Sequence, residues 1–182
     1  ILGKGVLKNN QLEPFLTKES AERFLNSDKK FDYLKLEDKF IFLVKEDQKA
    51  EDLRVLGSKI QGLIADSSEE ISLVGKEKYA LSVAEGLALA NYQFNRFFTK
   101  AKSNKLQTIF VQEEINDDNL HELNNTIKSV YWTRDVVNTP VSHLNATQLA
   151  DEIVGLGNEA GFSVQVLEKT QIESLKMGGL LA

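Results

Sequence analysis

The sequence predicts an α/β fold in which strands and helices form layers. From residue 71 onward, short apolar runs alternate with longer segments of helical period, starting with a strand at 71–74, a helix at 77–94 and a strand at 106–112. Such alternation is typical of layered α/β domains. The sequence contains no internal repeat, heptad array or low-complexity segment.

Three elements are expected before this alternation. A short helix over 17–26 begins at a capping residue, Thr17, and an apolar, β-rich run at 40–44 predicts a strand that is buried on both faces. Leucine and isoleucine of helical period predict a helix over 51–64. The side chains of the two helices expected to face the core are Ala21, Phe24, Leu25, Leu53, Leu56, Ile60 and Leu63.

The helix over 77–94 is apolar on nearly every side, which is usual for a helix held between a sheet and another layer. Gly86 lies in its middle, where glycine costs about 1 kcal/mol relative to alanine. We therefore expect another backbone to pack closely against Gly86.

A corner between two helices follows near residue 140. The first helix starts among the capping residues 116–119 and must end at about Asn138, because Pro140 lacks a backbone N–H and keeps the preceding residue out of the helical region. The second helix covers 145–160, where Asn145 and Gln148 predict a capping box and Gly161 a C-terminal stop. A strand at 162–167 and a short helix at 170–176 complete the prediction.

Composition narrows the functional class. The 182 residues are 42% hydrophobic and 27% charged and include no cysteine, so thiolate metal ligands, disulfides and a cysteine nucleophile are excluded. The net charge of −5 argues against a general nucleic-acid or membrane-surface binder. No apolar run approaches the roughly 20 residues that span a bilayer. The start without Met and the apolar finish at 178–182 lead us to expect part of a longer protein.

The candidate catalytic motifs are incomplete. His121 opens a sequence similar to the zinc motif HExxH, but Asn125 stands where the second histidine is required. His143 follows Ser142 directly, and neighbouring side chains are expected to diverge, so a loop or capping role is favoured over a nucleophile–base pair. Residues 74–77 resemble part of a phosphate-binding loop but lack its first glycine and its final Ser or Thr. An ordinary strand–helix turn is favoured there, with anion binding at the helix start as the alternative.

Charged clusters have structural explanations as well. Three carboxylate pairs precede or begin expected helices, where they complement the helix dipole: Glu69-Glu70, Glu113-Glu114 and Asp117-Asp118. A metal site at the last pair is the weaker alternative. The basic stretch 96–105, with phenylalanines nearby, has the composition of a single-strand nucleic-acid binder, but a solvated turn explains it equally well. Arg134, in an otherwise apolar register, predicts a partly buried ion pair.

Three segments carry a resemblance to a known family. Residues 134–140 read RDVVNTP and 143–150 read HLNATQLA, which resembles the start of the catalytic domain of the leucyl aminopeptidases (cytosol aminopeptidase, peptidase family M17). Residues 162–167 and 175–182 are similar to the family's next strand and its LGMGALLAV segment. Residues 84–94 resemble the EGxxLxxYxF helix of the N-terminal domain. Ala146 replaces a common proline, a change that should leave the helix cap intact.

The resemblance implies a fold and a role. It implies a mixed sheet flanked by helices, related to macro domains. It also implies three parts: an N-terminal α/β domain over 1–116, a linking helix over 117–138 and the start of the catalytic domain over 139–182. The intact enzyme would be a cytoplasmic hexamer that removes N-terminal residues from peptides with two divalent metals, zinc or manganese. The family's metal ligands lie in VGKGxTFDSGG and NTDAEGR segments, and neither occurs here. No catalytic or metal-binding residue is therefore expected in these 182 residues.

The expected role is architectural. The chain would pack on its own catalytic domain and support assembly, with a structural corner formed by Arg134, Asp135, Asn138, Pro140 and Asn145. Hydrolysis by this chain alone is not expected, because a two-metal hydrolase needs clustered carboxylates. The alternative from another class is a stand-alone macro-like module that binds a nucleotide or ADP-ribose.

Overall fold

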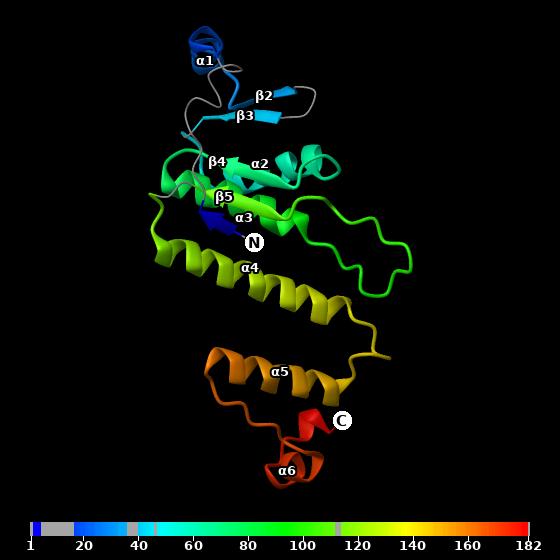
Figure 1. Cartoon of the computed structure of the whole chain (residues 1–182). Helices are drawn as coiled ribbons and strands as arrows, with labels where there is room; N and C mark the ends of the chain where they lie inside the picture. Colours follow the sequence, from blue (N-terminus) through cyan, green and yellow to red (C-terminus); the bar gives the residue numbers. More distant parts are fainter. Residues whose placement is uncertain (1, 5–16, 36–39, 46, 112–113, 182) are drawn as a thin grey trace. The chain divides into compact units, whose positions relative to one another are not determined.

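A computed structural model of the chain describes residues 2–4, 17–35, 40–45, 47–111 and 114–181 (Figure 1). Two compact units emerge, Ile1–Thr133 and Arg134–Ala182, and each is considered by itself. Strands and helices alternate as the sequence predicts, which confirms the α/β class. No helix in the described ranges has both the length and the apolar character needed to cross a membrane.

The first unit contains five strands and most of the helices in the described residues. Its elements are β1 (Leu2–Lys4), α1 (Lys18–Leu25), β2 (Phe31–Lys35), β3 (Phe40–Val44), α2 (Ala50–Ile64), β4 (Glu70–Leu73), α3 (Glu77–Asn91), β5 (Thr108–Val111) and α4 (Asp117–Asn138). Helix α4 continues into the second unit, whose other elements are α5 (Ala146–Ala160), α6 (Lys169–Ser174) and the 3₁₀ turn η2 (Gly178–Leu180).

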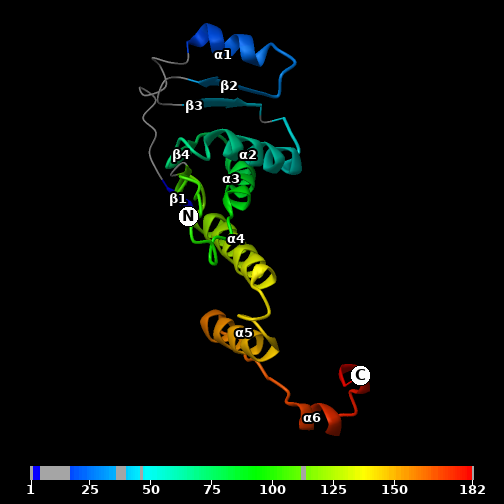
Figure 2. The same ribbon diagram turned by 90° about the vertical axis from the view of Figure 1, so that its right-hand side faces the viewer.

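A parallel sheet of three strands in the order β1-β5-β4 lies at the centre of the first unit. Leu2 pairs with Ile109, and Ile109 pairs on its other side with Ile71, so these apolar side chains share one face. Figures 1 and 2 show α2 and α3 on one side of this sheet. The sheet edge at β1 is closed by α4. The Asn124 side chain accepts a hydrogen bond from the Leu2 N–H at 3.2 Å and donates one to the Leu2 carbonyl at 3.3 Å.

A separate antiparallel pair, β2 and β3, lies between α1 and α2 (Figure 2). Its register places Tyr33 opposite Phe42 and Lys35 opposite Phe40. Phe31, Tyr33, Phe40 and Phe42 stack on one face, with ring centroids 5.8–6.4 Å apart. The strand at 40–44 is thus present but half-buried, so the expectation that it is buried on both faces is wrong. Within the described ranges it pairs with β2 alone.

The core forms where α2 crosses α3. Gly57 and Gly86 allow close contact there: a Cβ on Gly86 would lie 2.8 Å from the Arg54 Cα, and a Cβ on Gly57 would lie 2.8 Å from the Leu87 backbone nitrogen. The close approach predicted at Gly86 is confirmed. The largest fully buried side chains in this core are Leu53, Ile60, Ile64, Leu87 and Val111. Burying each stabilises the fold by about 1.5–3 kcal/mol.

Side-chain contacts also join α2 to α3 and α3 to α4. Arg54 Nε lies 2.6 Å from the Glu85 carboxylate across the α2–α3 crossing, and this hydrogen bond raises the pKa of Arg54 above its usual value. Glu77, at the start of α3, accepts hydrogen bonds from the Asn116 N–H at 3.2 Å and the Asn119 side chain at 2.7 Å. The first turns of α3 and α4 are therefore joined.

Several local expectations differ from the structure. Helix α3 ends at Asn91 and not at Phe94, and the Asn91 side chain donates to the Leu106 carbonyl at 2.8 Å where the chain returns. Leu25 and Leu63, expected in the core, are exposed, because the neighbouring apolar positions of their helices already face the layer beneath. The predicted strand at 106–112 is confirmed over Thr108–Val111, while Gln112 lies outside the described residues.

The second unit is built on α5, with little interior of its own. Gly161, at φ +78°, ends α5 as predicted. Residues 162–167 lie in neither a strand nor a helix, so the strand prediction is wrong: a strand needs a hydrogen-bonded neighbour, and none pairs with this segment among the described residues. Gly157 is the only buried residue in the described part of this unit.

Candidate functional site

The corner after α4 is closed by hydrogen bonds from Thr139. Its backbone N–H donates to the Asp135 carbonyl at 3.0 Å, and its hydroxyl donates to the same oxygen at 2.7 Å. Helix α4 ends at Asn138, as Pro140 predicts. The Pro140 carbonyl then accepts from the backbone N–H groups of His143 at 2.8 Å and Leu144 at 3.0 Å, which forms the turn.

Helix α5 leaves this turn through a complete capping box. The Asn145 side chain accepts from the Gln148 N–H at 3.0 Å, and the Gln148 side chain accepts from the Asn145 N–H at 2.9 Å. The predicted cap is confirmed. Together, the Thr139 bonds, the Pro140 turn and this cap fix the path of the backbone from residue 135 to residue 148.

The other predicted corner residues, Arg134, Asp135 and Asn138, are polar or charged and lie in the last two turns of α4. Arg134 is half-buried, whereas Asp135 and Asn138 are exposed. The ion pair expected of Arg134 stays a prediction, as does the role of Arg134, Asp135 and Asn138 in positioning one domain on another.

Ser142 and His143 differ from expectation. The Ser142 hydroxyl lies 2.9 Å from His143 Nδ1, so the two neighbouring side chains meet, and the expectation that they diverge is wrong. The tight turn after Pro140 brings them to the same side. Both side chains are exposed, however, whereas an activated nucleophile works in a site that excludes water. The pair is best described as a loop contact, in line with the role favoured from the sequence.

His121 lies on a polar face of α4. It belongs to one open face of this helix, here called the α4 face, formed by Asp118, His121, Glu122, Asn125, Thr126, Ser129 and Val130. Among the described residues, no three His, Cys, Asp or Glu side chains come together as metal ligands would. Asp117 and Asp118 lie in the first turn of α4, where carboxylates complement the helix dipole.

The turn before α3 has the geometry of an ordinary strand–helix connection. Gly75 has a φ of +151°, which favours glycine there. Glu77 directs its carboxylate to Asn116 and Asn119, so the first residue of α3 contacts the start of α4. Sequence reasoning missed this contact and the Asn124–Leu2 bridge, since each joins residues far apart in the chain without a local pattern.

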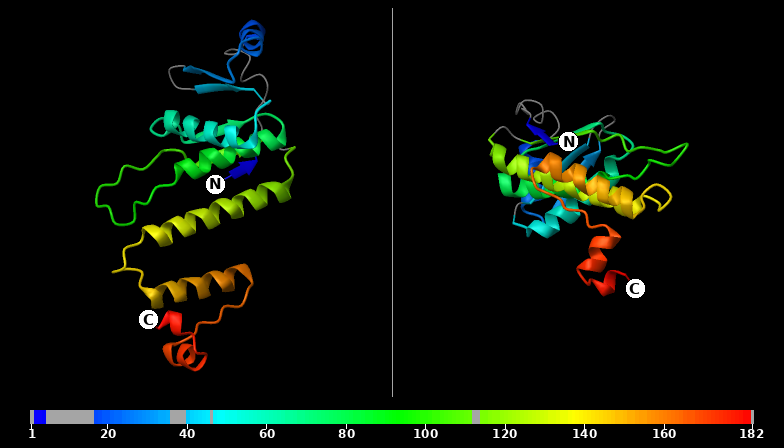
Figure 3. Two further views of the ribbon diagram at one scale, coloured as in Figure 1. Left: turned by 180° about the vertical axis from the view of Figure 1, so that it is seen from behind. Right: turned by 90° about the horizontal axis from the view of Figure 1, so that it is seen from below.

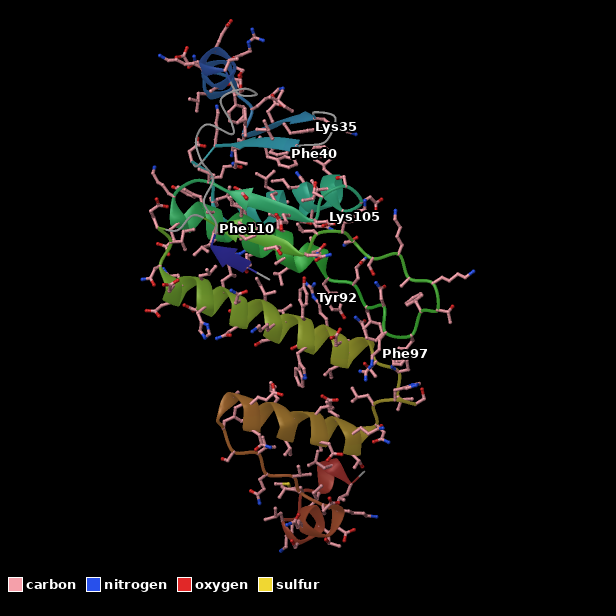
Figure 4. All side chains as sticks on the ribbon, viewed as in Figure 1. Lys35, Phe40, Tyr92, Phe97, Lys105 and Phe110 are labelled. Atoms are coloured by element: carbon pink, nitrogen blue, oxygen red, sulfur yellow. The ribbon has the colours of Figure 1, made fainter. Side chains whose placement is uncertain are left out.

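The basic segment lies in a long connection between α3 and β5, here called the 92–107 loop. Figure 4 shows Tyr92 and Lys105 at its two ends and Phe97 in its projecting part. Tyr92 packs edge-on against Tyr131 of α4, with ring centroids 5.1 Å apart, and the Tyr131 hydroxyl donates to the Ala88 carbonyl. The start of the loop is therefore fixed to α4.

Comparison with known proteins gives consistent matches. A probable cytosol aminopeptidase of Clostridium perfringens is 32% identical over 126 residues, which cover 63% of this chain and 25% of that protein. One from Chlorobaculum parvum is 53% identical over 49 residues, covering 27% of this chain and 10% of that protein. No protein-family model matches the chain. The chain spans about a quarter of the length of the first curated relatives it matches.

Solved structures share the fold. A tomato leucine aminopeptidase variant superposes with a TM-score of 0.68 at 20% identity, over 92% of this chain and 37% of that one. The bottromycin maturation enzyme BotP, also solved in complex with Mn, gives a TM-score of 0.64 at 16% identity in that form, over 96% of this chain and 38% of that one. The small sheets flanked by helices therefore resemble in fold the N-terminal domain of leucine aminopeptidase.

Proposed function

We propose that this chain belongs to the N-terminal region of the leucyl aminopeptidases (cytosol aminopeptidases, peptidase family M17) and is a non-catalytic, architectural part of such an enzyme. The similarity to probable cytosol aminopeptidases and to a solved leucine aminopeptidase supports this proposal. Its role would be to pack against a catalytic domain and to support assembly of the enzyme into an oligomer, a hexamer in the resemblance noted above.

The observation that carries this proposal is the apolar surface of the second unit. Val137, Val141 and Leu180 are 77%, 79% and 71% exposed, and they belong to a larger set of exposed apolar side chains that includes Ile153, Phe162, Val166, Leu175, Met177 and Leu181. Isolated exposed apolar residues are ordinary, but so many in fewer than fifty residues are typical of a surface that another part of a protein covers. The proposed cover is the rest of the catalytic domain.

The proposed domain division follows from this surface. Residues 1–116 would form the N-terminal domain, 117–138 the linking helix, and 139–182 the start of the catalytic domain. In support, the segment around α5 has one buried glycine, whereas the α2–α3 crossing in the first unit has a dense apolar core. The corner residues Arg134, Asp135, Asn138, Pro140 and Asn145 would set the path between the two domains.

The proposed activity of the intact enzyme is the release of N-terminal amino acids from peptides in the cytoplasm with two divalent metals. The BotP structure in complex with Mn supports metal use in a protein of this fold. The described residues of this chain do not fit a two-metal centre, because no three of their potential ligands converge. The metals would therefore be held by other residues of the enzyme.

Hydrogen exchange of the purified 182-residue chain tests this proposal. If the second unit depends on a missing cover, its α5 amides should exchange far faster than those of α2 and α3, since few apolar contacts oppose local opening. Protection of α5 equal to that of α2 would contradict the proposal, because the second unit would then be stable without a catalytic domain.

A further inference from the structure

The 92–107 loop is braced between its two arms. The Gln93 side chain accepts a hydrogen bond from the Asn104 N–H at 2.7 Å, and the Asn95 side chain donates one to the Ser103 hydroxyl at 3.3 Å. Figures 1 and 3 show the loop projecting from the first unit. A braced loop loses little conformational freedom when it binds a partner, so its projecting end is suited to form a contact.

Aromatic side chains are exposed at this projecting end. Every residue from 96 to 103 is exposed. Phe98 is 67% exposed and Phe97 is 40% exposed, and the Phe97 ring lies 5.7 Å from that of Phe94. An aromatic residue can bury about 150–250 Å² when it is covered. The end of the loop therefore offers a substantial apolar area to a partner.

Cationic side chains accompany these rings. The cations of the loop, which contains no carboxylate, are Arg96, Lys100, Lys102 and Lys105. Lys102 pairs with Asp66 at 2.6 Å. The Arg96 guanidinium lies 5.8 Å from the centre of the Phe97 ring, and both Arg96 and Lys100 are exposed. Although the whole chain has a net charge of −5, exposed charges act over only about 10 Å at 0.1 M salt. The end of the loop is therefore locally positive and fits an anionic partner.

The shape of the loop decides which anionic partner it fits. Single-stranded nucleic acids are bound along grooves whose aromatic side chains stack on successive bases, and peptides are bound in grooves or at sheet edges. The end of the loop is instead a convex projection, with successive exposed residues from 96 to 103. A bilayer surface accepts such a projection, because aromatic rings enter the region between the headgroups while Lys and Arg keep their charges at the phosphates.

We propose that the 92–107 loop attaches the protein reversibly to membrane surfaces that carry anionic lipids. Phe98 enters the interface beside Phe97, and Arg96 and Lys100 lie at the level of the headgroups. The cytoplasmic leaflet of a cell membrane is negatively charged, so it supplies such a surface. A single loop gives weak, reversible binding, because stable anchoring takes a second signal. This attachment goes beyond the architectural role proposed above and does not depend on it.

Co-sedimentation with vesicles tests the attachment. The 182-residue chain should sediment with vesicles of phosphatidylserine and phosphatidylcholine in equal amounts, and raising the salt concentration should release it. Each Lys or Arg near an anionic surface raises the vesicle partition coefficient about fivefold. Vesicles of phosphatidylcholine alone should therefore bind the chain at least tenfold more weakly.

Variants of the loop remove its charge and its apolar area separately. Arg96→Glu with Lys100→Glu should weaken binding to the anionic vesicles at least twentyfold, because two attractive charges become repulsive. Phe98→Ser should weaken it about tenfold, since the apolar ring no longer enters the interface. Phe98→Trp, made together with Trp132→Phe, should still bind. Its fluorescence should shift to shorter wavelength on binding, because residue 98 then lies in the interface.

Matched variants control for net charge and for apolar exposure. Lys59→Glu with Lys128→Glu makes the same change in net charge on exposed side chains of α2 and α4. Leu25→Ser removes an apolar side chain of α1 that is 64% exposed, close to the value for Phe98. Both controls should bind the anionic vesicles as the unaltered chain does. Circular dichroism should show the same fold in every variant.

The outcomes separate the possible surfaces and partners. The proposal is overturned if the unaltered chain does not bind the anionic vesicles, or if the fluorescence of residue 98 does not shift. It is also overturned if the loop variants bind as well as their matched controls, because another surface then makes the contact. Binding of a fluorescent single-stranded oligonucleotide that Arg96→Glu with Lys100→Glu abolishes, without vesicle binding, would assign the loop to nucleic acid instead. Hydrogen exchange of α5, which tests the architectural role, should be the same in all these variants.

Discussion

The α2–α3 crossing gives a prediction that the structure makes quantitative. Gly86→Ala adds one methyl group where α3 meets α2. The new Cβ would lie 2.7 Å from the Arg54 carbonyl carbon and 2.8 Å from the Arg54 Cα. Both are backbone atoms, so no side-chain rotation relieves the contact, and the helices must move apart. The Arg54–Glu85 ion pair spans the same crossing and would be displaced with them.

Two opposing terms set the size of the effect. Replacing a mid-helix glycine by alanine stabilises a helix by about 1 kcal/mol, because alanine loses less backbone entropy on folding. Overpacking a tight site costs about 1–3 kcal/mol, occasionally more. Because the clash involves backbone on both sides, we expect the upper end of that range and a net destabilisation of about 1–2 kcal/mol.

Gly62→Ala is the matched control. Gly62 lies in α2, the other helix of the crossing. It is exposed and has no atom within 4 Å of a built Cβ, so only the helix-propensity gain applies. Urea unfolding followed by circular dichroism should give a lower midpoint for Gly86→Ala and a midpoint equal to or above that of the unaltered chain for Gly62→Ala. If Gly86→Ala were as stable as Gly62→Ala, the close crossing would be refuted.

Two smaller effects follow from the corner and from β2. Asn145→Ala should remove the α5 cap and reduce the stability of that helix by about 0.5–2 kcal/mol, measured by faster exchange of the α5 amides, while Asn145→Asp should keep the cap. The hydrogen bond from Lys29 Nζ, 2.9 Å away, lowers the pKa of Asp32. A depressed carboxyl pKa means that the pair stabilises the fold above the unfolded-state pKa of about 3.9 and loses this contribution as the pH falls through the lower folded-state value. Asp32→Asn should therefore narrow the difference in stability between pH 7 and pH 2, as measured by thermal unfolding.

Local patterns predicted the elements that depend on local chemistry. Pro140 ended α4, Asn145 with Gln148 capped α5, and Gly161 stopped it, because each effect acts within a few residues. The close approach at Gly86 could also be predicted from the sequence, because a glycine inside a helix lowers its stability and is expected there mainly where another backbone packs closely. Gly57 could have been found in the same way, because it shares the face of α2 with Leu53 and Ile60.

Contacts between residues far apart in the chain could not be predicted from the sequence. The alternation at 162–167 predicted a strand, but pairing depends on a neighbour that the pattern does not specify. The bridge from Asn124 to Leu2 spans 122 positions and follows from how α4 lies along the sheet edge. The family resemblance found the corner because the matching residues are continuous in sequence.

The central claim is that this chain is the non-catalytic part of an aminopeptidase, and its activity is the most direct measurement. The purified 182-residue chain, supplied with Mn²⁺ or Zn²⁺, should not release the chromophore from a leucyl chromogenic substrate above the rate of buffer with metal. It should also retain no metal after gel filtration, because its described residues lack a converging set of ligands. Metal-dependent release that follows the protein through purification and stops on chelation would contradict the account.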